Sequence, residues 1–136
     1  MKVATILAHI QVEAGREGDF EAIVRSLFAE THAKESGVLH YEYWRGAEPG
    51  LYYCLLAFDH FHTFLAHQTS AHHEAASPRL GEVIRDIRLE WLDPVSGASP
   101  LPMTEMQSLP DNADELTRRY HKIFAAKIQD WWRSRR

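Results

Sequence analysis

The chain has 136 residues, of which 45% are hydrophobic and 25% charged, and its formal net charge at pH 7 is −4. These values are typical of one globular domain with enough apolar material for a core, and the negative charge gives no reason to expect a nucleic-acid partner. The single cysteine, Cys54, excludes an internal disulfide and a multi-thiolate metal site. No segment has the roughly 18–20 apolar residues that a membrane span requires, so we expect a cytoplasmic enzyme or binding protein without membrane contact.

The first half of the chain alternates between strand and helix patterns. Residues 3–13 alternate apolar and more polar side chains, which predicts a strand. The apolar residues from Phe20 to Phe28 recur at spacings of three and four, which predicts an amphipathic helix, and Gly37 is expected to end it in the αL conformation. Two more strands, VLHYEYWRG (38–46) and LYYCLLAFD (51–59), are joined by a turn at Pro49-Gly50.

A second helix and a last strand complete the predicted domain. Asp59 is the expected N-cap of the helix, the segment 69–71 is expected to kink or restart it with Ser70 as a second cap, and Pro78 is expected to limit it. Residues 84–94 alternate again and predict a strand. The resulting order β-α-β-β-α-β indicates an α+β fold of the ferredoxin-like type with an antiparallel sheet.

The predicted third strand is apolar on both faces. A sheet with helices on one side and water on the other does not need this pattern, so we expect the second face to be covered as well, with another subunit as one candidate.

The C-terminal part differs from the domain of residues 3–95. Residues 96–111 are rich in Pro, Ser and Met and predict a linker. Residues 112–134 predict an amphipathic helical extension, with Asn112 and Glu115 as its capping box. A helix of this length is marginal alone in water, so we expect it to pack either on its own domain or on a partner.

Five of the nine histidines lie at positions 60, 62, 67, 72 and 73. Two histidines on one helix chelate a metal from positions i and i+4, or less often i+3, and none of these pairs has either spacing. A metal would need further ligands from the strands, such as His9, His40 or Glu42. The sequence therefore predicts no metal site.

Two segments carry a resemblance to a known family. The segment ESGVLHYEYWR (35–45), together with Ala66-His67, Ser70 and His72 on the second helix, resembles the antibiotic biosynthesis monooxygenase domain over roughly residues 3–95. The resemblance implies a dimeric α+β barrel formed through the sheets of a homodimer, with a pocket between sheet and helices in each subunit. Activities in the family include cofactor-free oxidation of quinols and phenols by O₂, haem breakdown and isomerisation of small signalling molecules.

The chain departs from this family at two positions. The haem degraders and the quinone-forming monooxygenases resemble one another in using an asparagine and a tryptophan near the pocket. The only asparagine here is Asn112, in the extension, and Phe58 stands where the third strand would end in tryptophan. These departures argue against both mechanisms, and most strongly against haem breakdown.

The predicted site combines histidines with aromatic side chains. His67, His72 and His9 are the candidate acid–base residues, because a neutral imidazole can take a proton from a phenol or quinol and return it. The alternative for His67 and His72 is a structural role at the kink, and His60, His62 and His73 are expected to be solvated. The face of the sheet that His9 occupies stays open at this point. An aromatic wall suited to a flat ligand is expected from Tyr41, Tyr43, Trp44, Tyr53, Phe58 and Phe64, with core packing as the alternative for each.

The favoured function is a cofactor-independent monooxygenase that oxidises a small aromatic or quinol-type substrate with O₂. No cofactor is expected, since the chain contains no G-x-G-x-x-G motif. The alternatives are a non-oxidative isomerase or cyclase that uses the same pocket, and a non-catalytic module that binds a small molecule or serves a stress response.

Overall fold

The computed structural model describes residues 3–136, and its core is one four-stranded antiparallel sheet. The strands are β1 (Ala4–Val12), β2 (Val38–Arg45), β3 (Leu51–Phe58) and β4 (Ile84–Trp91), in the spatial order β2-β3-β1-β4. In the central pair Ala8 lies opposite Cys54, and His9 lies opposite Tyr53. The predicted ferredoxin-like α+β fold is confirmed.

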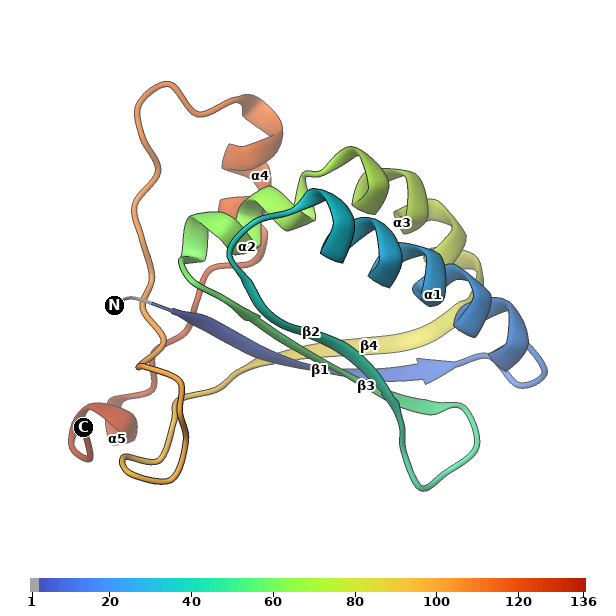
Figure 1. The fold of residues 1–136 in the computed structure, drawn as a ribbon, viewed down its shortest axis with the longest axis horizontal. Coiled ribbons are helices and arrows are strands. Elements are labelled where there is room, and N and C mark those ends of the chain that lie inside the picture. Colours follow the sequence, from blue (N-terminus) through green and yellow to red (C-terminus); the bar gives the residue numbers. More distant parts are fainter. Residues whose placement is uncertain (1–2) are drawn as a thin grey trace.

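Three helices cover one face of this sheet (Figure 1). They are α1 (Glu17–Lys34), α2 (Phe61–Gln68) and α3 (Ala71–Val83). The apolar residues that predicted α1 are buried against the sheet except for Phe28, which is exposed. Phe61, Phe64 and Leu65 of α2 are buried as well. The core therefore lies between the helices and the alternate strand residues that point toward them, for example Ile6, Ala8 and Ile10 of β1.

The second predicted helix is broken at Thr69 and Ser70. Ser70 caps α3 by accepting a hydrogen bond from the backbone N–H of His73, at 3.3 Å, which confirms the predicted restart. Two details of the prediction were wrong. Asp59 does not cap α2, because its carboxylate accepts a hydrogen bond from the Thr63 hydroxyl instead. Pro78 lies inside α3, since the helix continues to Val83.

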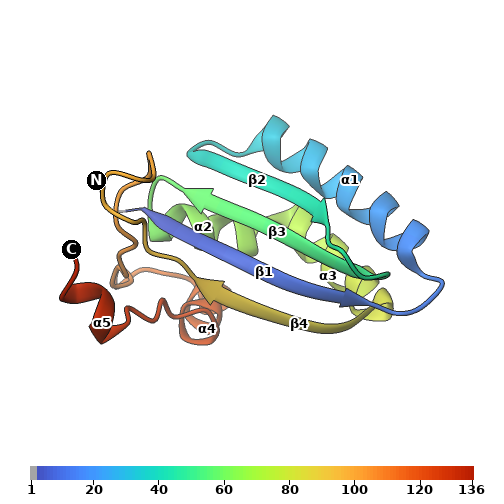
Figure 2. The same cartoon turned by 90° about the horizontal axis from the view of Figure 1, so that it is seen from below.

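Within residues 3–136 the other face of the sheet carries no helix (Figure 2). The alternate residues on this face include half-buried Leu7, His9, Tyr53 and Leu55, together with Trp44, whose side chain is 59% exposed. The sheet of the single chain is open and is not closed into a barrel. Among residues 3–136 no helix is both long and apolar enough to cross a membrane.

The C-terminal segment packs on its own chain rather than extending away from it. Its residues 103–105 run beside the start of β1, where Val3 and Thr104 form a parallel bridge. The buried Thr104 hydroxyl donates a hydrogen bond to the Leu92 carbonyl at 2.5 Å. The last residue, Arg136, forms ion pairs with Asp93 and Glu105 near the end of the sheet where β1 begins.

The single helix expected over 112–134 is instead two helices, α4 (Glu115–Ile123) and α5 (Asp130–Arg133). The N-cap of α4 is Asp114, which accepts a hydrogen bond from the Thr117 N–H at 2.7 Å, and not Asn112. The helix ends at Ile123 although Ala125, Ala126 and Lys127, which follow Phe124, favour a helix. Phe124 packs against the core, and such tertiary contacts override intrinsic helix propensity.

Candidate functional site

A cavity of about 640 Å³ lies between the sheet and its helices. Its walls are mostly apolar residues of β1, β3, β4 and α3. Its polar and charged lining residues are Tyr41, Tyr43, His67, Gln68, His73, Ser77, Arg85 and Asp86. It reaches the surface along β4, where Ile87 and Leu89 face the helix side and stay partly exposed. A largely apolar cavity with a few convergent polar groups is the usual form of a small-molecule site.

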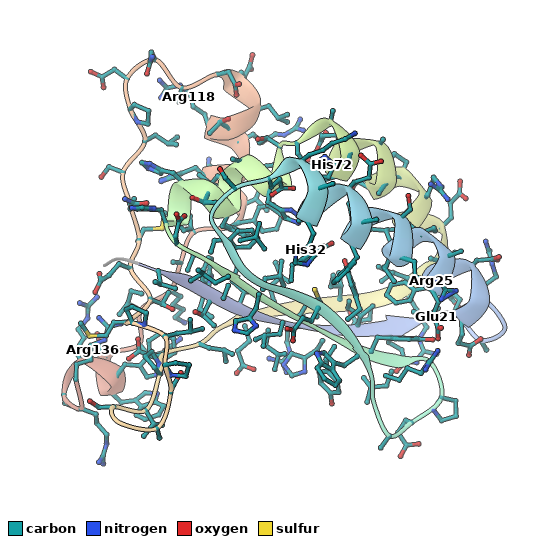
Figure 3. All side chains as sticks on the ribbon, in the orientation of Figure 1. Glu21, Arg25, His32, His72, Arg118 and Arg136 are labelled. Carbon is teal, nitrogen blue, oxygen red and sulfur yellow. The ribbon has the colours of Figure 1, made fainter. Side chains whose placement is uncertain are left out.

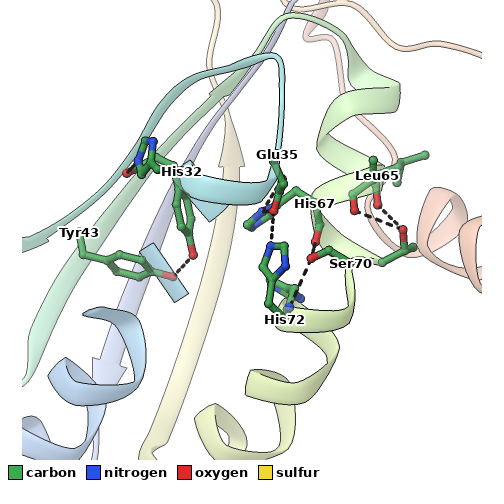
Figure 4. A network of polar contacts seen from close by, with 11 residues as sticks. His32, Glu35, Tyr43, Leu65, His67, Ser70 and His72 are labelled. Carbon is green, nitrogen blue, oxygen red and sulfur yellow. Dashed lines mark hydrogen bonds and ion pairs between the residues drawn. The ribbon is translucent and has the colours of Figure 1, made fainter. Parts of the chain in front are cut away.

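His67 is a buried polar residue of this lining. Its side chain is 1% exposed, and its Nδ1 lies 2.9 and 3.1 Å from the two carboxylate oxygens of Glu35 (Figure 4). The imidazole also contacts the rings of Tyr41 and Phe58, with centroids 4.8 and 5.4 Å away. These contacts on several sides fix the orientation of the ring.

Glu35 is the residue that directly follows α1, and its backbone N–H still donates a hydrogen bond to the Thr31 carbonyl. Its carboxylate holds a second imidazole, because Oε2 lies 2.5 Å from His72 Nε2. Burial alone would raise the pKa of Glu35, but the hydrogen bonds and charges of His67 and His72 outweigh burial and lower it. The carboxylate is therefore ionised at neutral pH and accepts hydrogen bonds from both rings.

This arrangement sets the proton positions of His67. An ionised carboxylate only accepts hydrogen bonds, so Nδ1 carries the proton, and in the neutral ring Nε2 keeps its lone pair. Nδ1 is occupied by Glu35, which leaves Nε2 as the nitrogen available to a ligand in the cavity. A carboxylate-oriented imidazole of this kind can act as a general base.

The described part of the chain contains one group of side chains that could hold a metal ion. It consists of Glu35, His67 and His72, whose ligand atoms lie within 4.8 Å of one another. The i, i+4 criterion missed this set because it joins the end of α1 to two helices separated by a break. Two ligand atoms on one ion lie about 3 Å or more apart. The 2.5 Å contact between His72 and Glu35 is shorter, so the group as placed fits a shared proton, and an ion would require Glu35 to move.

His73 is a second imidazole of the cavity, and the prediction that it is solvated was wrong. Ser70 starts α3 in a direction that carries His73 inward, where its ring centroid lies 4.9 Å from that of His67. Its Nδ1 is buried and has no hydrogen-bond partner among residues 3–136. Burial, followed by the nearby charge of His67, lowers the pKa of His73 to about 4, so this ring is neutral at pH 7.

Two tyrosines of β2 also belong to the polar lining. The hydroxyl oxygens of Tyr41 and Tyr43 lie 2.8 Å apart, and burial, with Cys54 as the next cause, raises both phenol pKa values above their usual range. Each hydroxyl has one proton, and the hydrogen bond between them uses one, so the other is left to donate to a ligand. Burial also raises the pKa of the Cys54 thiol to about 12, which keeps it protonated and unreactive.

The structure separates the remaining predicted residues into three groups. Phe64 lines the cavity, and Phe58 packs behind His67 in the core. His72 does not line the cavity and is tied to Glu35 near the surface, at the opposite end of the molecule from Arg136 (Figure 3). His9, Trp44 and Tyr53 lie on the open face, where His9 Nε2 is 3.0 Å from a carboxylate oxygen of Glu90.

Several residues of the site were missed at the level of sequence, above all Glu35, His73 and Phe124. Glu35 belongs to the ESG segment used for the family resemblance, and that segment was the signal that could have found it. Phe124 lies within the predicted amphipathic extension of residues 112–134. No sequence signal gave the direction of His73, because it depends on the angle between α2 and α3.

Comparisons with known proteins agree with this architecture. The sequence profile of the family described as antibiotic biosynthesis monooxygenase matches residues 4–79, more than half of the chain. A candidate antibiotic biosynthesis monooxygenase from Caulobacter crescentus has 25% identity and a TM-score of 0.66, over 69% of this chain and 91% of its own. A second candidate, from Bacteroides thetaiotaomicron, has 16% identity and a TM-score of 0.66, over 78% of this chain and 97% of its own, and shows similarity of fold.

A protein from Pseudomonas aeruginosa has 20% identity and a TM-score of 0.62, over 68% of this chain and 93% of its own. No curated protein matches the sequence. The profile match over more than half of the chain, on a fold whose sheet, helices and cavity agree with it, shows that the chain belongs to the antibiotic biosynthesis monooxygenase family.

Proposed function

We propose that this chain is a cofactor-independent monooxygenase that oxidises a small hydroxylated aromatic or quinol-type substrate with O₂. Family membership and the candidate monooxygenases of similar fold support a monooxygenase-like role in general. The observation that carries the finer proposal is the Glu35–His67 pair, which presents an oriented imidazole to an apolar cavity. The cavity walls suit a flat ring, since Phe64, Tyr41 and Tyr43 all contribute to them.

In this proposal His67 removes the hydroxyl proton of the substrate at Nε2. The resulting phenolate is electron-rich and reduces O₂ directly, and a C–O bond then forms at a ring carbon that bears hydrogen. One oxygen atom stays on that carbon as a carbonyl. The other leaves as water together with the two hydrogen atoms that the substrate loses, so that the substrate is oxidised to a quinone and O₂ is fully reduced.

The remaining polar groups position the substrate. The free proton of the Tyr41–Tyr43 pair can donate to a substrate oxygen, and His73 is neutral, so it adds no positive charge to the cavity. Glu35 is a positioning residue, because it acts on the substrate only through His67.

Oxygen consumption tests this proposal. Protein freed of metals and flavins is mixed with a panel of benzo-, naphtho- and anthrahydroquinones, and O₂ uptake is measured with an electrode against buffer alone. His67→Ala is expected to lower the rate by about 10²- to 10⁴-fold, as for the loss of a general base. His9→Ala, on the open face, is the control and is expected to keep at least half of the rate. No uptake above buffer, or equal loss in both variants, would contradict the proposal.

A non-oxidative reaction is the second candidate, because two imidazoles, His67 and His73, line one cavity. Such a pair can remove a proton at one position of a ligand and return it at another. This candidate predicts conversion of an enolisable carbonyl compound under argon at the rate seen in air, whereas the oxidative proposal predicts no conversion without O₂.

We also propose that two copies of the chain pair through their open sheet faces. Leu7, Leu55 and Trp44 give this face apolar surface that is not covered within one chain. Light scattering at rising protein concentration is expected to give the mass of a dimer. Replacement of Leu55 and Trp44 by glutamate is expected to give the 15.7 kDa monomer.

A further inference from the structure

Phe124 reaches the cavity from a part of the chain that lies outside the family match. The profile match ends at residue 79, whereas Phe124 follows α4 in the C-terminal segment and is among the cavity-lining residues. We propose that Phe124 is a specificity-determining residue, whose ring ends the cavity beside α2 and limits the length of the aromatic ligand. The inference rests on the proposed function in one respect: it assumes that the aromatic ligand binds in the same cavity.

The ring of Phe124 continues the aromatic wall of the cavity. It packs perpendicular to Phe64, which also lines the cavity, with the ring centroids 5.9 Å apart at an interplanar angle of 89°. On its other side it meets Tyr120 of α4 at 5.5 Å. Perpendicular contacts of this kind are a favoured packing of aromatic rings, so Phe124 holds a defined position.

The backbone around Phe124 is fixed by local contacts. The Phe124 N–H donates to the Tyr120 carbonyl at 2.8 Å, and the chain leaves the helical conformation at this residue. The following Ala126 N–H donates to the Met106 sulfur at 3.1 Å, and His121 Nε2 lies 2.8 Å from the Gln107 carbonyl. The helix therefore ends at the residue whose side chain enters the cavity.

The whole segment is attached to the domain on both sides of Phe124. Before it, Gln107 and Ser108 hold His62 of α2 through its N–H and Nε2, at 3.1 and 2.8 Å. Within α4, the Tyr120 hydroxyl donates to Glu74 of α3. After it, Arg136 pairs with Asp93 and Glu105. A side chain carried by a segment with so many attachments is a rigid wall rather than a loose cover.

The chemical consequence is a limit on the size of the ligand. Replacing the ring of Phe124 by a methyl group adds the volume of one aromatic ring to the cavity at the α2 end. A ligand with one more fused ring would then fit, whereas one that already fits would lose the contact with Phe124. Loss or gain of an apolar contact in a pocket changes affinity by about tenfold or more.

Ligand binding without turnover tests the inference. The dissociation constants of 2-naphthol and 2-anthrol are measured under argon by their fluorescence, for the unmodified chain, Phe124→Ala and Phe124→Leu. The unmodified chain is expected to favour 2-naphthol. Phe124→Ala is expected to shift the ratio of the two constants toward 2-anthrol by at least tenfold, with Phe124→Leu between. Ile123→Ala is the matched control, since the neighbouring Ile123 is 60% exposed and is expected to leave the ratio unchanged.

A shift below twofold in Phe124→Ala, or an equal shift in Ile123→Ala, would overturn the inference, as would failure of both compounds to bind the unmodified chain. If Phe124→Ala does not fold, as judged by circular dichroism, Phe124→Leu decides alone, with a threefold shift as the criterion. A chain that shows the shift but consumes no O₂ retains this inference and loses the proposed function. A chain that consumes O₂ but does not show the shift retains the proposed function and loses this inference.

Discussion

The two faces of the sheet carry similar residue types in different surroundings. On the face under the helices, Tyr41 and Tyr43 surround a cavity with His67. On the open face, Tyr53 contacts His9 edge to face, with ring centroids 5.5 Å apart. Adjacent residues of one strand point to opposite faces, so the difference follows from register and not from composition.

The same contrast applies to the two histidine–carboxylate pairs. The side chains of His67 and Glu35 are 1% and 12% exposed, whereas those of His9 and Glu90 are 26% and 48% exposed. The contact distances are nearly equal, at 2.9 and 3.0 Å. Distance alone therefore does not distinguish a buried pair from a surface pair, whereas exclusion of water does, because it strengthens and orients the interaction.

The largest expected difference between the faces is in stability. Phe58→Ala on the covered face is expected to lower the free energy of unfolding by about 3–5 kcal/mol, since Phe58 is fully buried. Trp44→Ala on the open face is expected to change it by about 0.5 kcal/mol or less at low protein concentration. Urea unfolding measures both, and Phe58→Leu replaces the alanine variant if that variant does not fold. Similar losses at the two positions would show that both faces are covered in the single chain.

A pH-dependent effect is expected from His73 on the covered face. Burial, then the charge of His67, lowers its pKa from 6.5 to about 4 in the folded chain, so between these values the unfolded chain binds a proton that the folded chain does not. Stability therefore falls as the pH decreases from 6.5 to 4, by as much as about 3 kcal/mol. His73→Gln is expected to remove this component in urea unfolding at pH 7, 5.5 and 4. An unchanged pH dependence in the variant would show that another group is responsible.

The smallest expected effect on the free energy of unfolding comes from the carboxylates of Glu35 and Glu90. Because one lies on each side of the sheet, their replacement compares the two faces directly. Glu35→Gln is expected to lower the free energy of unfolding at pH 7 by about 2 kcal/mol, because a buried, charged acceptor is lost. Glu90→Gln is expected to cost less than about 1 kcal/mol. The pKa of Glu35 is lowered below 4.5, so its contribution is present above that pH and is lost as the pH falls through the lower value of the folded state.

The measurement for this pair is thermal unfolding of the unmodified chain and both variants between pH 3 and 7. The difference between the unmodified chain and Glu35→Gln is expected to shrink below pH 4.5. Equal losses for Glu35→Gln and Glu90→Gln at pH 7 would contradict the distinction between a buried and a surface pair.

Much of the fold could be predicted from the sequence. Alternation in residues 3–13 and the helical spacing from Phe20 to Phe28 placed β1 and α1, because one apolar face of each element must be buried. Ser70 marked the restart of the helix, since its hydroxyl can accept from a free N–H of the first turn. The extension was predicted less well, because the end of α4 depends on where Phe124 packs.

The sequence by itself determined the order of the strands and helices up to β4, the apolar faces that form the core, and the family to which residues 4–79 belong. Only the tertiary structure decided that Glu35 meets His67 and His72, that His73 turns inward while His9 stays on the open face, and that Phe124 reaches the cavity. The reason is physical: periodicity reports which face of one element avoids water, whereas a site depends on the angles and distances between elements far apart in the chain.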